Sequence, residues 1–452
     1  MRWNIVLAAF AAAALAAAPS AHAAPWRQLT AAGGQNIDQV GLARTADGIL
    51  HVLWHRRATP TTEDVLHTAI KPDGTVGATS TVVSGWASTD NPDVTVTPGG
   101  LRAFWGGIRS LDPNDANDDM NSALSSDGGA TWALQPGSVV APAASAYGSP
   151  VSVATRPDGT PVLTWYGSLG VWVHSGLDPA TPNHDFQAPL GNYGYYSGIA
   201  IDSAGRTTIA WYSNATGHLG VFAQGVNPDG SPLGAPLNMP GTGNMSVGQL
   251  ARTPIVARPG GGVYVAYPTG YPSQNQVRVW AVGSPKTTLL ARTGGDSVAT
   301  IAADPNGRLW VAWRKGAKVF ARRSNAKATE WGATVAAGAP KGAASLYHLD
   351  ANATGKALDL LGNFSLGTAS TTSTYATRIA PGLTLAASRS SHSATVRFFV
   401  TDAGAPVKGA KVKGGGHSAT TDSHGRAKLT LKRRATVTAS ASGYVDATLR
   451  LK

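Results

Sequence analysis

A short pattern of apolar and polar residues recurs along most of the chain. Each copy is an alternating apolar strand, a tight turn that contains glycine, and a second alternating strand, which is the pattern of a β-hairpin. The copies occupy residues 41–54, 93–105, 151–165, 199–211, 255–267, 299–313 and 347–361. In each copy a turn glycine precedes a bulky residue by six positions, in the pairs Gly48–Trp54, Gly99–Trp105, Gly159–Trp165, Gly205–Trp211, Gly261–Tyr267, Gly307–Trp313 and Gly355–Leu361.

The spacing of the copies predicts the architecture. Successive turn glycines lie 46 to 60 residues apart, which is room for four short strands. Four-stranded sheets repeated radially form a β-propeller, so seven copies predict an all-β fold with seven blades over residues 24–384. No repeat remains after residues 372–380, so the segment 24–30 is expected to supply the missing outer strand and to close the ring. The repeated aromatic residues are expected to fill the wedges between blades. The alternative is a ring of sugar-stacking tryptophans.

The first residues have the composition of an export signal. Arg2 precedes an apolar run from Ile5 to Ala18, and the triplet Ala21-His22-Ala23 has the small-x-small pattern of a cleavage site. We therefore interpret residues 1–23 as a secretory signal peptide and expect a secreted or extracellular protein. No later stretch reaches the roughly 18 apolar residues of a membrane span. The chain has no cysteine, which excludes thiol chemistry and thiolate metal sites.

The positive charge is concentrated at the C-terminal end. The chain has a net charge of +12, and residues 385–452 hold twelve Lys and Arg against three Asp, a net +9. A basic module of this kind can hold the protein on an anionic cell-envelope polymer or polysaccharide. The alternative is an ordinary soluble, charged exterior. We expect no nucleic-acid partner and a monomer.

One turn in the second copy carries a recognisable motif. The residues Ser125-x-Asp127-x-Gly129-x-Thr131-Trp132 match, residue for residue, the Asp-box of the sialidase (BNR-repeat) superfamily, and residues 324–331 hold a worn copy. The chain therefore resembles that superfamily over its repeats. The resemblance implies a propeller on which the Asp-box is a structural turn, on the face opposite the functional one.

The loops of the opposite face carry the candidate catalytic residues. The segment 54–65 is expected to be a loop, and the candidates are His55, Glu63, Asp64 and Asp90. Hydrolysis of a glycoside generally needs two placed carboxylates, for which Asp38 is a further candidate. Sialidases resemble one another in an Arg-Ile-Pro motif, which is absent here, and Asp38 stands where its arginine is expected. They also have six blades rather than seven, so standard sialidase catalysis is not expected. A polysaccharide lyase that uses His55 with a facing tyrosine remains open.

The same face is expected to carry residues that bind a ligand. Tyrosines among glycines can stack on sugar rings, and arginines can bind carboxylates. The alternative is that these side chains only pack the loops. The candidates are Arg56, Arg57, Arg109, Tyr193, Tyr195, Tyr196, Tyr212, Arg252, Tyr267 and Arg314, with Tyr166 and Tyr271 on the same side.

An acidic loop is a candidate calcium site. Residues 112–119 contain Asp112, Asp115, Asp118 and Asp119, together with Asn114 and Asn117. Calcium takes about 6–8 oxygen ligands, which such side chains supply. The run lacks the Gly and closing Glu of an EF-hand loop, and the alternative is a solvated acidic loop. No other cofactor is expected.

The residues from 385 to 452 change in pattern to short alternating strands with a turn every 8–12 residues or so, which is typical of a small β-sandwich. They look like a bacterial Ig-like or carboxypeptidase-regulatory-like domain, a resemblance that rests on Gly404-Ala405-Pro406-Val407-x-Gly409-Ala410-x-Val412, Thr421-Asp422-x-x-Gly425 and Gly443-Tyr444. It implies a spacer, a stabiliser or an adhesive module. Residues 383–393 are the expected linker.

The sequence thus favours an exported sialidase-like propeller that binds a glycan or another surface ligand through its loops, without standard sialidase catalysis. The alternative is a carbohydrate-active enzyme, either a divergent glycoside hydrolase or a polysaccharide lyase. A third possibility is a protein-binding scaffold, because propellers serve all three purposes.

Overall fold

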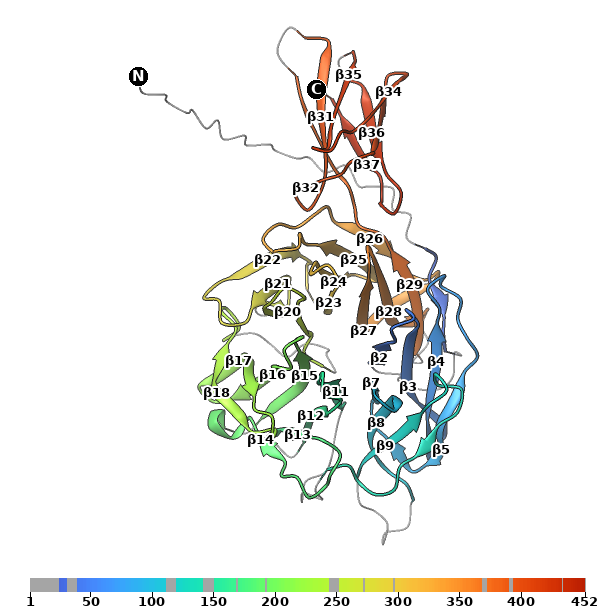
Figure 1. The fold of residues 1–452 in the computed structure, drawn as a ribbon, viewed down its shortest axis with the longest axis vertical. Helices are drawn as coiled ribbons and strands as arrows, with labels where there is room; N and C mark the ends of the chain where they lie inside the picture. Colours follow the sequence, from blue (N-terminus) through green and yellow to red (C-terminus); the bar gives the residue numbers. More distant parts are fainter. Residues whose placement is uncertain are drawn as a thin grey trace.

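The computed structural model of the chain is a ring of sheets with a smaller group of strands at its edge (Figure 1). It describes residues 24–30, 39–110, 119–140, 150–167, 170–191, 193–243, 252–270, 273–295, 297–367, 372–389, 393–432 and 434–451. Across these ranges the structure is all-β, with a single 3-10 turn, η1 (Ala188–Leu190), and no α-helix. No helix in these ranges is long and apolar enough to cross a membrane. The predicted signal peptide, residues 1–23, lies outside them.

The strands before residue 380 pair in seven antiparallel sheets, which we number I to VII in chain order. Sheet I holds β2 (Gly41–Arg44), β3 (Leu50–Thr59), β4 (Thr62–Ile70) and β5 (Ser80–Trp86). Sheet II holds β6 (Ser88–Thr89), β7 (Asp93–Thr97), β8 (Gly100–Ile108), β9 (Asp119–Ser125) and β10 (Ala133–Leu134). Sheet III holds β11 (Ser152–Thr155), β12 (Pro161–Gly167), β13 (Gly170–Ser175) and β14 (His184–Asp185).

The remaining ring sheets follow the same order. Sheet IV holds β15 (Gly194–Ile201), β16 (Thr207–Ala215), β17 (His218–Val226) and β18 (Pro232–Asn238). Sheet V holds β19 (Ile255–Ala257), β20 (Val263–Thr269), β21 (Gln276–Ala281) and β22 (Thr287–Arg292). Sheet VI holds β23 (Ala299–Ala303), β24 (Leu309–Lys315), β25 (Lys318–Arg323) and β26 (Val335–Gly338). Sheet VII combines β27 (Ala343–Thr354), β28 (Ala357–Leu366) and β29 (Thr372–Ile379) with the N-terminal β1 (Arg27–Gln28).

The strands β2, β7, β11, β15, β23 and β27 lie toward the middle of the ring, as Figure 1 shows. These inner strands approach closely where they lack side chains. A Cβ atom on Gly41 would stand 2.6 Å from the Cα of Asp93, and one on Gly198 would stand 2.1 Å from the carbonyl oxygen of Thr253. The strands run from one face of the ring to the other. We call the face with the glycine turns after the inner strands (45–49, 155–160 and their equivalents) the turn face, and the opposite face the loop face.

The bulky residue of each repeat is buried between sheets. The exposed fraction of Trp54, Trp105, Trp165, Trp211, Tyr267, Trp313 and Leu361 is between 0% and 3%. Trp105 of β8 packs in one hydrophobic cluster with Leu53 of β3, so this cluster joins sheets I and II. The repeat therefore encodes the packing between sheets, and its tryptophans are not exposed for sugar stacking.

The strands from residue 384 form a separate group, which we call the C-terminal module (384–451). One sheet contains β30 (Thr384–Ser388), β31 (Thr395–Asp402), β32 (Ala405–Pro406) and β35 (Arg426–Thr430). The other contains β33 (Lys411–Gly414), β34 (His417–Thr420), β36 (Thr436–Ser440) and β37 (Ala447–Arg450). A hydrophobic cluster of their own fills the space between them. The prediction of a linker over 383–393 is wrong at its start, because Leu383 and Leu385 are buried in this cluster and 384–388 pairs with β31.

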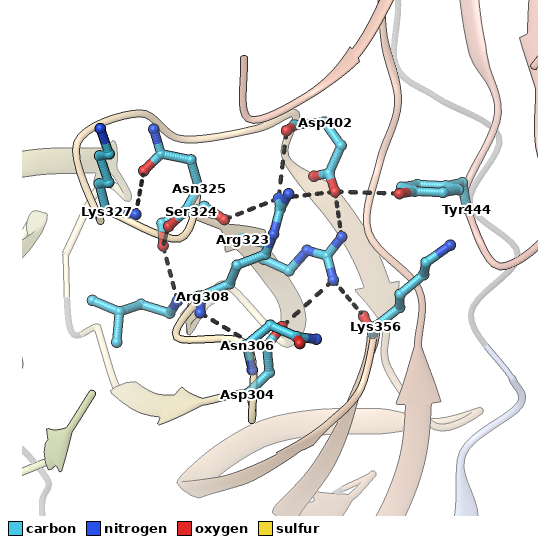
Figure 2. Close-up of polar contacts among 11 residues, drawn as sticks. Asp304, Asn306, Arg308, Arg323, Ser324, Asn325, Lys327, Lys356, Asp402 and Tyr444 are labelled. Carbon is cyan, nitrogen blue, oxygen red and sulfur yellow. Dashed lines mark hydrogen bonds and ion pairs between the residues drawn. The ribbon is translucent and has the colours of Figure 1, made fainter. Parts of the chain in front are cut away.

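A buried carboxylate fastens the module to the ring (Figure 2). Asp402 of β31 is 1% exposed and accepts hydrogen bonds from Arg308, at 3.1 Å, and from Arg323. Arg323 also lies 3.7 Å from Asp304 and donates to the carbonyl of Lys356 at 3.3 Å. The Lys356 ammonium in turn lies 4.7 Å from the centre of the Tyr444 ring. These contacts join sheets VI and VII to both sheets of the module on the turn face.

Candidate functional site

The predicted loop 54–65 is in fact a long hairpin. β3 runs to Thr59 and β4 begins at Thr62, so only two residues turn between them. Cross-strand pairing places Arg56 opposite Asp64 and Arg57 opposite Glu63. The sequence prediction missed the extra length because Asp and Glu are uncommon in strands, whereas ion pairing across the strands supports them here. The hairpin carries its charged residues to the loop face.

His55 and Glu63 share a partner at the base of this hairpin. The Nδ1 of His55 lies 2.9 Å from the carbonyl oxygen of Thr89 and 3.8 Å from Glu63 Oε2. A carbonyl only accepts, so Nδ1 carries the proton of the neutral ring and Nε2 is its basic nitrogen. Glu63 Oε2 accepts from the Thr89 amide at 2.7 Å. Burial raises the pKa of Glu63, but the hydrogen bonds from His55 and Thr89 outweigh it and lower that pKa to about 2.

Glu63 and Asp64 do not form a hydrolytic pair, because neighbouring residues of β4 face opposite sides of the strand. Asp64 Oδ2 lies 2.7 Å from the Arg56 Nη2, and its Oδ1 accepts from the Gly85 amide at 3.1 Å. Asp90 lies beyond β6, where its amide donates to Gly106. A general acid needs a raised pKa. Glu63 has the opposite, so it is not the acid of a glycosidase. Asp38, the further candidate, lies outside the described residues.

Three tyrosines meet at the loop-face ends of sheets III and IV. The ring of Tyr166 lies 5.7 Å from that of Tyr195 and 5.5 Å from that of Tyr196, both edge-on. All three are half-buried. A register shift between Tyr195 and Gly198 forms a bulge in β15. Tyr196 has a φ of 58° and Tyr193, which is 49% exposed, a φ of 80°. Bulky residues rarely adopt such a backbone, and strain of this kind concentrates at functional sites.

Two further tyrosines of the prediction are core residues. Tyr212 and Tyr267 lie in β16 and β20 rather than in loops, with exposed fractions of 1% and 0%. Both pack in the cluster that joins sheet IV to sheet V. Burial raises the pKa of Tyr212, of the neighbouring Tyr196, and most strongly of Tyr267. Neither core ring is placed to stack on a ligand, and Tyr271 lies outside the described residues.

Arg252 lies buried among backbone carbonyls of three sheets and is not exposed at the surface to bind a ligand carboxylate. It is 8% exposed. Its Nε donates to the carbonyl of Val151 at 2.8 Å, and its two Nη atoms donate to Val40 at 2.8 Å and Pro92 at 2.7 Å. These carbonyls directly precede the inner strands of three different sheets. The guanidinium is therefore fully engaged by the backbone, and it forms the floor of the loop face.

Two buried carboxylates that the sequence analysis missed balance this charge. Asp93 accepts from the amides of Val94 and Val153, both at 2.9 Å. Asp350 accepts from the Gln39 side chain at 2.6 Å. Burial raises the pKa of Asp93, and it raises that of Asp350 to about 6 although Gln39 and Arg252 oppose the change. The signal available in the sequence was an Asp at the inner-strand position where the other repeats are mostly apolar.

The remaining predicted arginines are separated. Arg109 lies over the ring of Trp86, with its Cζ 5.7 Å from the ring centre. Arg314 donates to the carbonyl of Leu346 on sheet VII. Arg56 and Arg57 are 45% and 43% exposed on the hairpin. Since neighbouring residues of a strand alternate between faces, these two guanidinium groups lie on opposite faces of the hairpin, beside Asp64 and Glu63.

Most of the predicted calcium loop lies outside the described residues. Asp112, Asp115 and Asp118 lie outside the described residues, and Asp119 is described only as part of β9. Elsewhere, in the part of the chain that the structure does describe, no group of three His, Cys, Asp or Glu residues is placed to hold a metal ion. The calcium site thus stays a prediction.

The turn at 125–132 is held by its own side chains on the turn face. Asp127 accepts from the Thr131 amide at 3.0 Å and from its hydroxyl at 2.6 Å, and Ser125 Oγ accepts from the Gly129 amide at 2.8 Å. The Trp132 indole donates back to the Gly129 carbonyl at 3.2 Å. The hydrogen bonds from Thr131, together with one from the Ser125 hydroxyl at 2.8 Å, lower the pKa of Asp127 to about 2. Asp127 is exposed, but its carboxylate is engaged by the turn itself.

This turn packs on a buried histidine pair of sheet I. His51 Nδ1 lies 3.0 Å from His67 Nε2, and His67 Nδ1 lies 3.1 Å from Ser80 Oγ. Ser80 donates its proton to the Gly129 carbonyl at 2.6 Å, so it accepts from His67. His67 therefore accepts from His51 through Nε2. Burial, then the nearness of His51, lowers the pKa of His67 to about 4.

A groove of about 770 Å³ also lies on the turn face, between sheets III, IV and V. It contains none of the predicted site residues. Arg156 lines it, but this guanidinium is already bound by the Ser175 hydroxyl at 2.8 Å and the Pro228 carbonyl at 2.7 Å. The groove thus presents mainly turn backbone and apolar side chains.

Comparison with known proteins finds similar solved structures but no family. No protein-family model and no curated protein matches the chain. Polysaccharide lyase Uly1 is 11% identical, with a TM-score of 0.48, over 77% of this chain and 91% of that one. A PL25 ulvan lyase bound to a GlcA–Rha3S glycan is 11% identical, with a TM-score of 0.45, over 78% and 96%. A GH43_1 enzyme from Xanthomonas citri, complexed with xylose, is 14% identical, with a TM-score of 0.35, over 79% and 90%. At such low identities the function has to be argued from the residues of this chain.

Proposed function

We propose that the protein is an exported, carbohydrate-active enzyme that cleaves an acidic polysaccharide on its loop face by elimination. The observation that carries this proposal is the tyrosine cluster of Tyr166, Tyr195 and Tyr196, held on a strained bulge. Tyr195 and Tyr196 also pack against the cluster that joins sheets IV and V, and the φ of 58° at Tyr196 is backbone strain of the kind that concentrates at functional sites. Tyrosine rings placed in this way can stack on sugars and donate a hydroxyl to them.

The geometry favours elimination over hydrolysis. A glycosidase generally requires a carboxylic acid that stays protonated. On this face Glu63 has a pKa of about 2, and Asp64 is paired with Arg56. Asp93 and Asp350, whose pKa values are raised, are buried near Arg252, with exposed fractions of 9% and 8%, and are not placed to contact a substrate. A lyase needs no such carboxylic acid. Its base removes the proton next to the uronate carboxyl group, the bond from C4 to the bridging oxygen breaks, and an acid protonates the leaving oxygen. His55 on sheet I has a basic Nε2 that is buried in this structure and must become accessible to act as the base, and Tyr196, whose pKa is raised, keeps its hydroxyl protonated as an acid.

His55 and the tyrosine cluster are on strands from opposite sides of the ring. β3, which carries His55, and β15, which carries Tyr195 and Tyr196, lie across the ring from each other in Figure 1. Elimination at one uronate needs its base and its acid at the same sugar residue, so the proposal requires His55 and Tyr196 to come together over Arg252 when the substrate binds. Neutralisation of the uronate carboxylate, which makes the neighbouring proton removable by a base, would then fall to Arg57, which lies beside Glu63 on the same strand face as His55.

Binding without catalysis is the second candidate. It is favoured by the number of charged groups on this face that already have partners, above all Arg252 with its three carbonyls. In that case the tyrosines hold a glycan and His55 is a structural residue. A scaffold for another protein is the third candidate, and it predicts no affinity for any glycan.

The remaining parts of the sequence interpretation belong to the same proposal. The seven ring sheets are taken as the blades of a sialidase-like propeller, residues 24–384. The turn at 125–132 is taken as its Asp-box. The C-terminal module is taken as an Ig-like domain, residues 385–452. The protein is taken to be monomeric and extracellular, possessing the cleavable signal of residues 1–23.

The experiment incubates residues 24–452 with polyuronates, sulfated uronic-acid polymers and neutral polymers, and follows the ultraviolet absorbance of unsaturated products alongside new reducing ends. Elimination gives both signals, hydrolysis gives only reducing ends, and a binding protein gives neither but is retained on one polymer. His55→Ala and Tyr196→Phe should each lower kcat at least about a hundredfold. Tyr264→Phe, on the turn face, is the matched control. Turnover that is unchanged in both site variants would refute this assignment.

A further inference from the structure

The C-terminal module has an exposed sheet face on which the cations lack partners. In β31 and β35 the residues alternate between buried and exposed, with Val396, Phe398 and Leu429 facing the module's core. The exposed residues of β31, β35 and β30 therefore share the opposite face. We call this the basic face, and it consists of Thr384, Ala386, Ser388, Thr395, Arg397, Phe399, Thr401, Arg426, Lys428 and Thr430.

The strand register places like charges directly opposite each other. Arg397 pairs with Lys428, and Phe399 pairs with Arg426. Like charges opposed across a sheet destabilise it. No carboxylate lies among the paired residues of this face, and neither Arg397 nor Lys428 makes an ion pair or a side-chain hydrogen bond within the described part of the chain. The fold thus keeps a repulsive pair that an anion would relieve.

An aromatic ring lies among these cations. Phe399 is 37% exposed, and the guanidinium of Arg426 lies over it, 5.6 Å from the ring centre. An exposed phenylalanine is disfavoured in water and is typical of a contact surface. An acidic polysaccharide presents both carboxylates and apolar ring faces along its length, so it complements cations that surround a ring.

Two of the three acids of the module already have partners, and the third, Asp446, directly precedes β37 of the other sheet. Residues 385–452 contain three Asp against twelve Lys and Arg. Asp402 is buried against Arg308 and Arg323 of the ring (Figure 2). Asp422 caps a turn, where it accepts from the amides of His424 and Arg426, both at 2.9 Å. Because its carboxylate is near Arg426, it offsets part of that charge, and Arg397 with Lys428 is the pair that stays uncompensated.

We propose that the basic face is a second binding site, distinct from the loop face, for a linear acidic polysaccharide that carries carboxylates. Arg397 and Lys428 bind the carboxylates, and Phe399 packs against a sugar ring between them. Since Asp402 fixes the module to the ring, this site has a set position relative to the loop face. It holds the protein on a polymer whether or not the loop face cleaves that polymer.

The test measures retention of the full chain on immobilised polygalacturonate, with dextran as the uncharged control polymer. Arg397→Gln/Lys428→Gln should weaken binding by roughly tenfold or more at physiological ionic strength. Lys411→Gln/Lys413→Gln removes the same charge from the other sheet, where both lysines are exposed and face Ser and Thr across the strands. This control should bind like the wild type. The melting temperature of the first variant should not fall, because it removes a repulsive pair.

An equal loss in both double variants would mean that only net charge matters, and this would overturn the proposal. Retention on dextran would overturn it as well, and so would equally tight binding to duplex DNA or to anionic lipid vesicles. Retention needs no turnover. A chain that cleaves nothing but still needs Arg397 and Lys428 for retention would refute the proposed function and leave this site standing. A chain that cleaves polyuronate with unchanged retention in that variant would do the reverse.

Discussion

The buried histidine pair of sheet I predicts a specific acid sensitivity. His67 is 2% exposed, and its pKa is lowered from 6.5 to about 4. In the unfolded chain this ring takes up a proton below pH 6.5, whereas in the folded chain it does so only near pH 4. Its contribution to stability is therefore complete above pH 6.5 and is lost as the pH falls toward 4. A gap of about 2.5 pH units, at about 1.4 kcal/mol each, gives roughly 3 kcal/mol. Burial also lowers the pKa of His51, which acts in the same direction.

Urea unfolding at a series of pH values between 4 and 7 measures this loss. In His67→Gln the amide oxygen can accept from His51 and the amide nitrogen can donate to Ser80, but nothing titrates. The free energy of unfolding of this variant should depend less steeply on pH than that of the wild type, by roughly 3 kcal/mol over the range. Asp350 and other acids titrate in both proteins and cancel in the comparison. His424→Gln, in an exposed turn, is the control. Equal pH dependence in wild type and His67→Gln would refute the reasoning.

Three more perturbations test the packing described above. Gly129→Ala should lower the free energy of unfolding by more than about 3 kcal/mol, because the new Cβ would stand 2.1 Å from His67 Cε1. Gly128→Ala, which has a similar φ but open space, should lower it by about 1 kcal/mol. Equal melting temperatures of the two variants would contradict this. Arg252→Met should destabilise the ring by about 3–5 kcal/mol, because three carbonyls and the buried carboxylates of Asp93 and Asp350 lose the charge of Arg252. An unchanged urea midpoint would show that Arg252 does not stabilise the ring. Asp402→Ala should split thermal unfolding into two calorimetric transitions, because it removes the ion pairs that join module and ring; a single transition at the wild-type temperature would show that the apolar contacts suffice.

The sequence predicts the fold more completely than it predicts the site, because the fold depends on local patterns. Hairpins are local, so a turn glycine and a bulky residue six positions later report their geometry within one repeat, and Trp211 lies buried where the repeat places a core residue. Side chains alternate between faces with every residue along a strand. Tyr267 occupies the repeat's core position, and its aromatic character misled the assignment to a ligand site. Tyr212 directly follows a core position, yet it too is buried, because sheet V covers the other face of β16.

The contacts that decide the rest of the site join distant segments. The carbonyl partners of Arg252 belong to Val40, Pro92 and Val151, and no local pattern connects them. An exposed-looking arginine in a loop is therefore indistinguishable from a buried one until the ring is assembled. The same holds for Asp402, whose arginine partners lie 79 and 94 positions earlier in the chain.

The short strand β1 determines the order in which this molecule can be completed. The amide of Thr374 donates to the Thr30 hydroxyl across 344 positions of chain, and Arg27 pairs with Ala376. β1 can therefore pair only after residues 372–379 of β29 have been synthesised. Contacts of such long range slow folding, because the entropy of closing the long loop is lost before the contacts form and offset it. Until then the outer edge of β29 is an open strand, prone to pairing with another chain. The state most prone to pair with another chain is therefore the one in which β1 has not yet paired with β29.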